Sequence, residues 1–250
     1  MKEKIYTIPV NDGFDAEGEC PFCFMERQAE QSAMRYVAGP GASYMEPDVR
    51  AATDRAGFCR CHMKKLYQYG NTLGNALMLQ TYMAGLLKEF DWEVDNLKIP
   101  EKKGLLLRKK NQPEDAYWKR LRQRTDSCYL CDKIDYNMQR YMETFFYLIR
   151  DEQFRQKVEN GKGFCLDHFA LLLRMAEDKL PSGQTQWFYE TVYAKMQSNL
   201  YRVKEDLDWL VAKYDFRNAG KPWGNSQDAL QRTMQKLTGG FPADPPLKQD

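Results

Sequence analysis

Seven cysteines and two histidines are the residues whose spacing predicts chemistry in this chain. Cys20 and Cys23 form a Cys-x2-Cys pair, and Cys59 and His62 form a Cys-x2-His pair. The same two kinds of pair recur as Cys128 with Cys131 and Cys165 with His168. Two residues between ligands let one turn or helix start direct both side chains at one ion, and two such pairs complete a tetrahedral shell. We therefore predict two metal sites and eight ligands.

The order of the pairs predicts an internal duplication. Between the two pairs lie 35 residues in the first half and 33 in the second, and each Cys-x2-His pair follows a Gly-Phe dipeptide, Gly57-Phe58 and Gly163-Phe164. Each half is expected to hold its own Cys3His site. We expect the glycines to permit a tight turn and the phenylalanines to pack beside sulfur and exclude water.

Three thiolates and one imidazole suit zinc, and such a set leaves no open position for a catalytic water. The predicted cofactors are therefore two structural Zn²⁺ ions. An iron–sulfur cluster with one histidine ligand is the main alternative. Reactive cysteines or disulfides are another, and His62 and His168 could be ordinary histidines. Helices are expected to begin at or just after each pair, where their N-terminal N–H groups stabilise thiolates.

Two residues beside the pairs have open roles. Cys61 is left over from the four pairs. We interpret it as a cysteine without a role at either site. As an alternative, it could replace one of the neighbouring ligands or act as a redox sensor. Asp167 precedes His168 and could orient the imidazole, although a solvated carboxylate is the favoured interpretation.

The apolar pattern predicts a mainly α fold with few strands. After Cys23 and after Cys131, apolar residues recur at spacings of three and four. A longer stripe runs from Phe188 to Tyr214, after a Pro181-Ser182-Gly183 break, and predicts a helix of about 30 residues. A last helix is expected from about Ser226 to Leu237. Asn225 or Ser226 would cap it, and Gly239-Gly240 would end it.

These features predict four segments. Residues 1–97 and 125–240 form the two helical halves, 98–124 is a basic connection, and 241–250 is a loose, proline-rich tail. The connection carries ten basic and three acidic residues, which is typical of a phosphate-binding patch when aromatics lie among them. The candidate nucleic-acid contacts are Arg108, Lys109, Lys110, Lys119 and Arg120. A solvated linker helix after Pro113 is the favoured alternative.

Composition limits the classes of function. The formal net charge of +2 does not indicate a nucleic-acid partner by itself. No apolar signal-peptide core or membrane-length run is present, so a cytoplasmic location, with reduced cysteines, is expected. A glycine-rich phosphate loop, an HExxH motif and a nucleophile motif are also missing from the sequence. We therefore favour a non-enzymatic protein, with an enzyme of unrecognised class as an alternative.

The four motifs together carry a family resemblance. CPFC at Cys20, GFCRCH at Gly57, CYLC at Cys128, GFCLDH at Gly163 and a later KYDFRN resemble an uncharacterised domain-of-unknown-function family of anaerobic bacteria. The resemblance covers nearly the whole chain and includes all eight ligand positions, but it implies no activity. The sequence thus favours a zinc-binding helical scaffold or interaction protein whose partner, a protein or a nucleic acid, is open. An iron–sulfur redox or sensor protein is the alternative.

Overall fold

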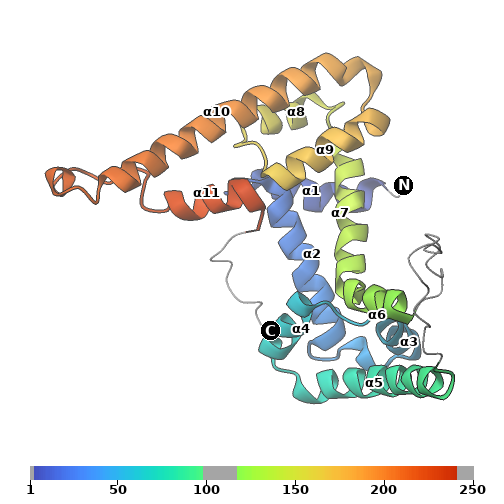
Figure 1. Ribbon diagram of the computed structural model, residues 1–250. Coiled ribbons are helices and arrows are strands. Elements are labelled where there is room, and N and C mark those ends of the chain that lie inside the picture. Colours follow the sequence, from blue (N-terminus) through green and yellow to red (C-terminus); the bar gives the residue numbers. More distant parts are fainter. Residues whose placement is uncertain (1–2, 98–116, 241–250) are drawn as a thin grey trace, which may run out of the picture. The chain divides into compact units, whose positions relative to one another are not determined.

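The computed structural model describes residues 3–97 and 117–240 (Figure 1). Within these ranges the chain is helical and contains no strand, which confirms a mainly α fold. The described chain forms two compact units. Residues 3–30 and 134–240 make unit 1, and residues 31–97 and 117–133 make unit 2. Unit 2 is therefore an insertion within unit 1, and the units do not follow the expected halves 1–97 and 125–240.

Unit 1 contains five complete α-helices and parts of two others, coloured from blue to red in Figure 1. Its core includes a cluster of phenylalanine rings: Phe14, Phe22, Phe145, Phe154, Phe164 and Phe188. The helices are α1 (Glu3–Asp15), the start of α2 (Pro21–Ala38), most of α7 (Tyr129–Leu148), α8 (Glu152–Asn160), α9 (Leu166–Lys179), α10 (Thr185–Ala212) and α11 (Ala229–Thr238). Two short 3-10 helices, η3 (Ser182–Gln184) and η4 (Phe216–Asn218), flank α10.

Unit 2 is built around the long helix α5. It contains the rest of α2, the 3-10 helix η1 (Ser43–Met45), α3 (Pro47–Ala56), α4 (Arg60–Tyr69), α5 (Thr72–Asp95), α6 (Tyr117–Asp126) and the start of α7. Helices α3 and α4 pack on α5. The core of this unit includes Met34, Val37, Leu66, Met78 and Leu130.

The two predicted C-terminal helices are present with different details. Helix α10 has 28 residues and begins after the Pro181 break, but the last residues of the apolar stripe, Val211 and Tyr214, are exposed. Helix α11 begins at Ala229, so the predicted cap was wrong: the hydroxyl of Ser226 donates to the Trp223 carbonyl instead. Gly239, with φ of 70°, follows the helix as expected.

The apolar region after His62 divides into two helices. Gly70 adopts a left-handed conformation with φ of 99° and ends α4. The side chain of Asn71 then caps α5 by accepting a hydrogen bond from the Gly74 N–H at 3.0 Å. Among the described helices, none combines the length and the apolar character needed to cross a bilayer.

Candidate metal centres

The structure brings the eight predicted ligands together in two groups of four. Site I consists of Cys20, Cys23, Cys165 and His168, and site II consists of Cys59, His62, Cys128 and Cys131. Within each group, the candidate ligand atoms all lie within 4.8 Å of one another. Site I lies within unit 1 and site II lies within unit 2. Each group could hold one metal ion.

The expectation that each half holds its own site was wrong. Cys23 meets His168, which follows it by 145 residues, and Cys131 meets His62, which precedes it by 69. Each site therefore takes its Cys-x2-Cys pair from one half and its Cys-x2-His pair from the other. The spacing identified the pairs, but two equivalent pairs of each kind can combine in two ways, and the packing of the helices decides between them.

All four pairs occupy the same position at a helix start. The first cysteine immediately precedes the helix and the second ligand is its third residue, in α2, α4, α7 and α9. Cys59 and Cys165 have nearly the same extended backbone, with ψ of 163° and 164°. The N–H of His168 donates to Cys165 Sγ at 3.4 Å, and that of Cys131 donates to Cys128 Sγ at 3.5 Å. These N–H groups stabilise thiolate charge at the helix ends.

Site I is buried, and its histidine presents one nitrogen to the sulfurs. His168 Nδ1 lies 3.1 Å from Cys165 Sγ, 3.5 Å from Cys23 Sγ and 3.6 Å from Cys20 Sγ. Its other nitrogen, Nε2, lies 3.8 Å from Oε2 of Glu26. A carboxylate near that nitrogen favours the tautomer that carries its proton on Nε2, which leaves Nδ1 free to bind a metal. Glu26 is therefore placed to orient the imidazole of His168, the role that the sequence suggested for Asp167. Asp167 is exposed.

Site II has the same donor arrangement with less burial. His62 Nδ1 lies 3.3 Å from the Sγ atoms of Cys59, Cys128 and Cys131. The Sγ atoms of Cys59 and Cys131 are 3.9 Å apart, and both residues are only partly buried. The imidazole nitrogen therefore faces three sulfurs in both sites, which is the donor set of a Cys3His centre.

The Gly-Phe dipeptides shape the turns before the Cys-x2-His pairs. Gly57 and Gly163 have φ of 59° and 77°, a region that favours glycine, as the sequence predicted. In site II the Gly57 carbonyl accepts from the N–H of Tyr129 at 2.9 Å, which links the two ligand-bearing segments. Phe164 is buried and stacks on Phe22, with ring centroids 5.7 Å apart. Phe58, its counterpart, is only partly buried.

A buried lysine, which sequence reasoning missed, links the backbones of site I. Lys236 in α11 is 1% exposed. Its Nζ donates to the carbonyl of Glu19, just before Cys20, at 2.6 Å, and to that of Phe164, just before Cys165, at 3.5 Å. It also lies 3.3 Å from the Glu19 carboxylate. One pattern in the sequence could have predicted that Lys236 is buried. It follows the buried Ala229 by seven residues and therefore lies on the same face of the helix.

Without an ion, the clustered thiols cannot all lose their protons. Burial tends to raise the pKa of Cys128, but hydrogen bonds from His62 and the backbone outweigh it and lower that pKa to about 6. Burial and the charge of Cys128 raise the pKa of Cys131. In site I, burial tends to raise the pKa of Cys20, but hydrogen bonds with Cys165 and Cys23 outweigh it and lower that pKa. Hydrogen bonds with Cys165 and Cys20 raise the pKa of Cys23. A divalent cation would remove this repulsion, so the donor chemistry fits a metal.

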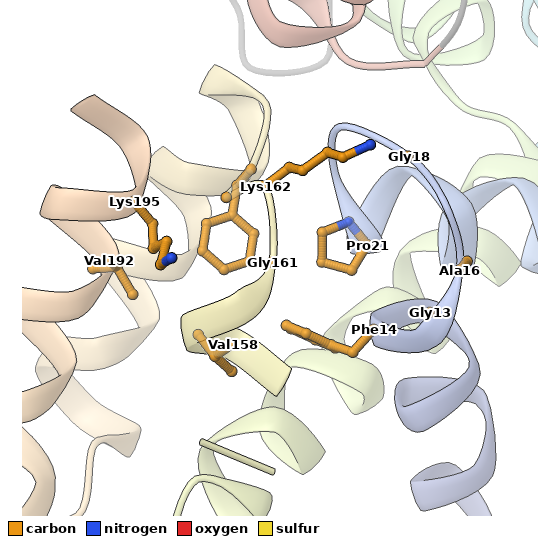
Figure 2. Close-up of a pocket in the computed structure, with 12 residues that line it drawn as sticks. Gly13, Phe14, Ala16, Gly18, Pro21, Val158, Gly161, Lys162, Val192 and Lys195 are labelled. Carbon is orange, nitrogen blue, oxygen red and sulfur yellow. The ribbon is translucent and has the colours of Figure 1, made fainter. Parts of the chain in front are cut away.

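Two cavities lie near site I in unit 1. One cavity has a volume of about 40 Å³. Figure 2 shows Phe14, Val158 and Val192 beside it, with Lys162 and Lys195 also around it. That volume suits one or two waters rather than a substrate. A more open cleft of about 350 Å³ is lined in part by Cys20 and Cys23 of site I.

The other candidate residues do not join the two centres. Cys61 is exposed in α4 and belongs to neither group of four. Lys119 and Arg120 lie in α6, and the Arg120 guanidinium pairs with Glu93 and, at 3.5 Å, with Glu89 of α5. The remaining predicted nucleic-acid contacts lie outside the described residues: Arg108, Lys109 and Lys110.

The described fold and the two groups define a class: helical proteins with two Cys/His centres that could bind metal, each joining segments distant in sequence. A family model described as a family of unknown function (DUF6062) matches residues 1–244, and the chain belongs to that family. No match was found among curated proteins or among solved structures.

Proposed function

We propose that this protein is a non-enzymatic helical scaffold held together by two structural Cys3His zinc sites. The observation that carries the proposal is that each group offers four protein donors, three sulfurs and one imidazole nitrogen, all within 4.8 Å of one another. Such a set fills a tetrahedral shell and favours zinc over harder cations. The ions join helix starts and stabilise the units. Both histidines of the sequence act as ligands, which leaves none for general acid–base catalysis.

Each zinc closes a longer loop than a site within one half would close. Ligands 145 residues apart in site I and 69 apart in site II constrain more of the unfolded chain than a loop of 35 residues. The entropic cost of closing a loop grows with the logarithm of its length. The ion of site I should therefore stabilise the folded state by about 1 kcal/mol more than an ion that closes the shorter loop. The equivalent positions of the four pairs support an internal duplication in which the halves exchange ligand pairs.

A macromolecular partner is part of the proposal. A nucleic-acid partner would use Arg108, Lys109, Lys110, Lys119 and Arg120. The ion pairs of Arg120 with Glu89 and Glu93 reduce the positive charge available from α6. A protein partner is therefore the better supported alternative.

Metal analysis of anaerobically purified full-length protein tests the proposal. We expect two zinc ions per chain, a flat visible spectrum and a loss of helical circular dichroism when a strong chelator removes the metal. Cys61→Ser is the matched control, because Cys61 belongs to neither site, and it should keep both ions. Stoichiometric iron with visible absorption would instead establish an iron–sulfur protein. Purified, folded protein that binds no metal would contradict both.

A further inference from the structure

Helix α5 exposes an apolar seam with the spacing of a coiled coil. Among its exposed residues, six apolar side chains and one glutamine follow one another in steps of three and four: Leu73, Ala76, Gln80, Met83, Leu87, Phe90 and Val94. Met83, Leu87 and Val94 are 48%, 55% and 59% exposed. The helix uses its other side, where Gly74 and Met78 are buried, to pack within unit 2. A repeat of 3.5 residues over three heptads is the pattern by which one helix packs along another.

We propose that this seam binds the α5 helix of a second copy of the chain, in antiparallel orientation, and that the protein is a homodimer. The seam complements itself when residues whose numbers sum to 170 face each other: Ala76 faces Val94, Gln80 faces Phe90, and Met83 faces Leu87. Every seam position from Ala76 to Val94 then meets a seam position of the partner helix. One twofold axis near residue 85 generates all these layers, as a closed isologous dimer requires.

The charges of α5 select the antiparallel orientation. Residues 72–87 contain no charged side chain, whereas Lys88 is followed by four acids: Glu89, Asp91, Glu93 and Asp95. In a parallel pair, the two acidic ends would lie side by side and repel each other. In the antiparallel pair, each acidic end lies along the uncharged end of the other helix. Within one chain, Glu89 and Glu93 pair with arginines of α6. The seam itself consists only of uncharged residues.

The oligomeric state of zinc-loaded, full-length protein tests the proposal. Sedimentation or light scattering should give twice the mass of one chain at micromolar concentration. Leu87→Glu places a carboxylate at a central layer and should weaken association by at least about 100-fold. Because Leu87 is exposed in a single chain, the variant should keep its two metal ions and its helical content. Trp92→Glu, on the same helix but off the seam and 60% exposed, is the matched control and should remain dimeric.

Orientation is tested by cross-linking. In a Cys61→Ser background, an equimolar mixture of Met83→Cys and Leu87→Cys chains should form a disulfide-linked heterodimer under mild oxidation, because these positions face each other. Covalent homodimers of each variant would indicate a parallel pair and overturn the orientation. A monomer at about 100 µM, or a dimer that Leu87→Glu leaves unchanged while it folds and binds metal, would overturn the proposal.

Discussion

The ammonium group of Lys236 lies 2.6 Å from the backbone oxygen of Glu19, the residue directly before ligand Cys20. A cation nine-tenths or more buried is stabilised only where it is paired and hydrogen-bonded. Lys236 meets that condition, since it contacts the carbonyls that precede both ligand pairs of site I and the carboxylate of Glu19. Helix α11 therefore contributes to site I without supplying a ligand.

Lys236→Met should destabilise the zinc-loaded protein by about 3 kcal/mol, because it leaves a buried carboxylate and three backbone carbonyls, those of Glu19, Lys162 and Phe164, without this donor. Urea unfolding followed by circular dichroism measures the change. Lys204→Met is the control, since Lys204 pairs with Asp208 on an exposed helix face and its loss should change stability by less than about 0.5 kcal/mol. Equal effects of the two substitutions would refute the role of Lys236.

Gly57→Ala and Gly163→Ala should each lower the free energy of unfolding by about 1–2 kcal/mol, because an L side chain is strained at positive φ. Gly57→Ala is expected to be the more destabilising of the two, because its new Cβ would lie 2.9 Å from the Tyr82 ring. Thermal unfolding of the zinc-loaded variants measures both. Gly183→Ala is the control: a Cβ there meets open space, so a loss as large as that of Gly163→Ala would contradict the argument.

Metal affinity at site II should fall as the pH falls. In the metal-free fold, Cys131 keeps its proton at neutral pH because its pKa is raised, and a bound metal expels that proton. Acid therefore favours the metal-free form. Between pH 8 and 7 the affinity should drop at least about tenfold, and the slope should steepen near pH 6, where Cys128 also takes up a proton. Chelator competition across this range measures the slope, and a pH-independent affinity would rule out thiolate ligands.

Glu26→Gln should weaken metal binding at site I by about tenfold, because Glu26 lies beside the His168 nitrogen that does not face the sulfurs. Stepwise removal of metal by a chelator, followed by metal analysis, separates the two sites. Site II provides an internal standard and should be unaffected. Glu205→Gln, an exposed residue of α10, is the control. Equal weakening at both sites would show that the effect is not local.

The sequence predicted the helical class and the eight residues that form the two groups, because both depend on local patterns. Apolar spacing identifies a helix such as α10, and a two-residue gap identifies a ligand pair at a helix start. It did not predict which pairs meet. That choice depends on packing between segments far apart in the chain, such as the ring of Phe22 on that of Phe164.

Residues that act through tertiary contacts were also missed. In the sequence, Glu26 and Lys236 look like ordinary charged residues of α2 and α11. Their roles depend on contacts that form only when these helices approach His168 and Glu19 in the folded chain. Helix α1, which carries an internal Pro9, was not predicted either. A proline inside a helix removes a backbone donor, so the local signal argued against the element that forms.

The crossed pairing of ligands is the central claim, and the metal content of two double variants tests it most directly. Cys23→Ser/Cys165→Ser removes two ligands from site I alone, so this variant should retain one zinc per chain. Cys23→Ser/Cys59→Ser removes one ligand from each site and should retain none. If each half held its own ion, the results would be reversed: the first variant would lose both ions and the second would keep one.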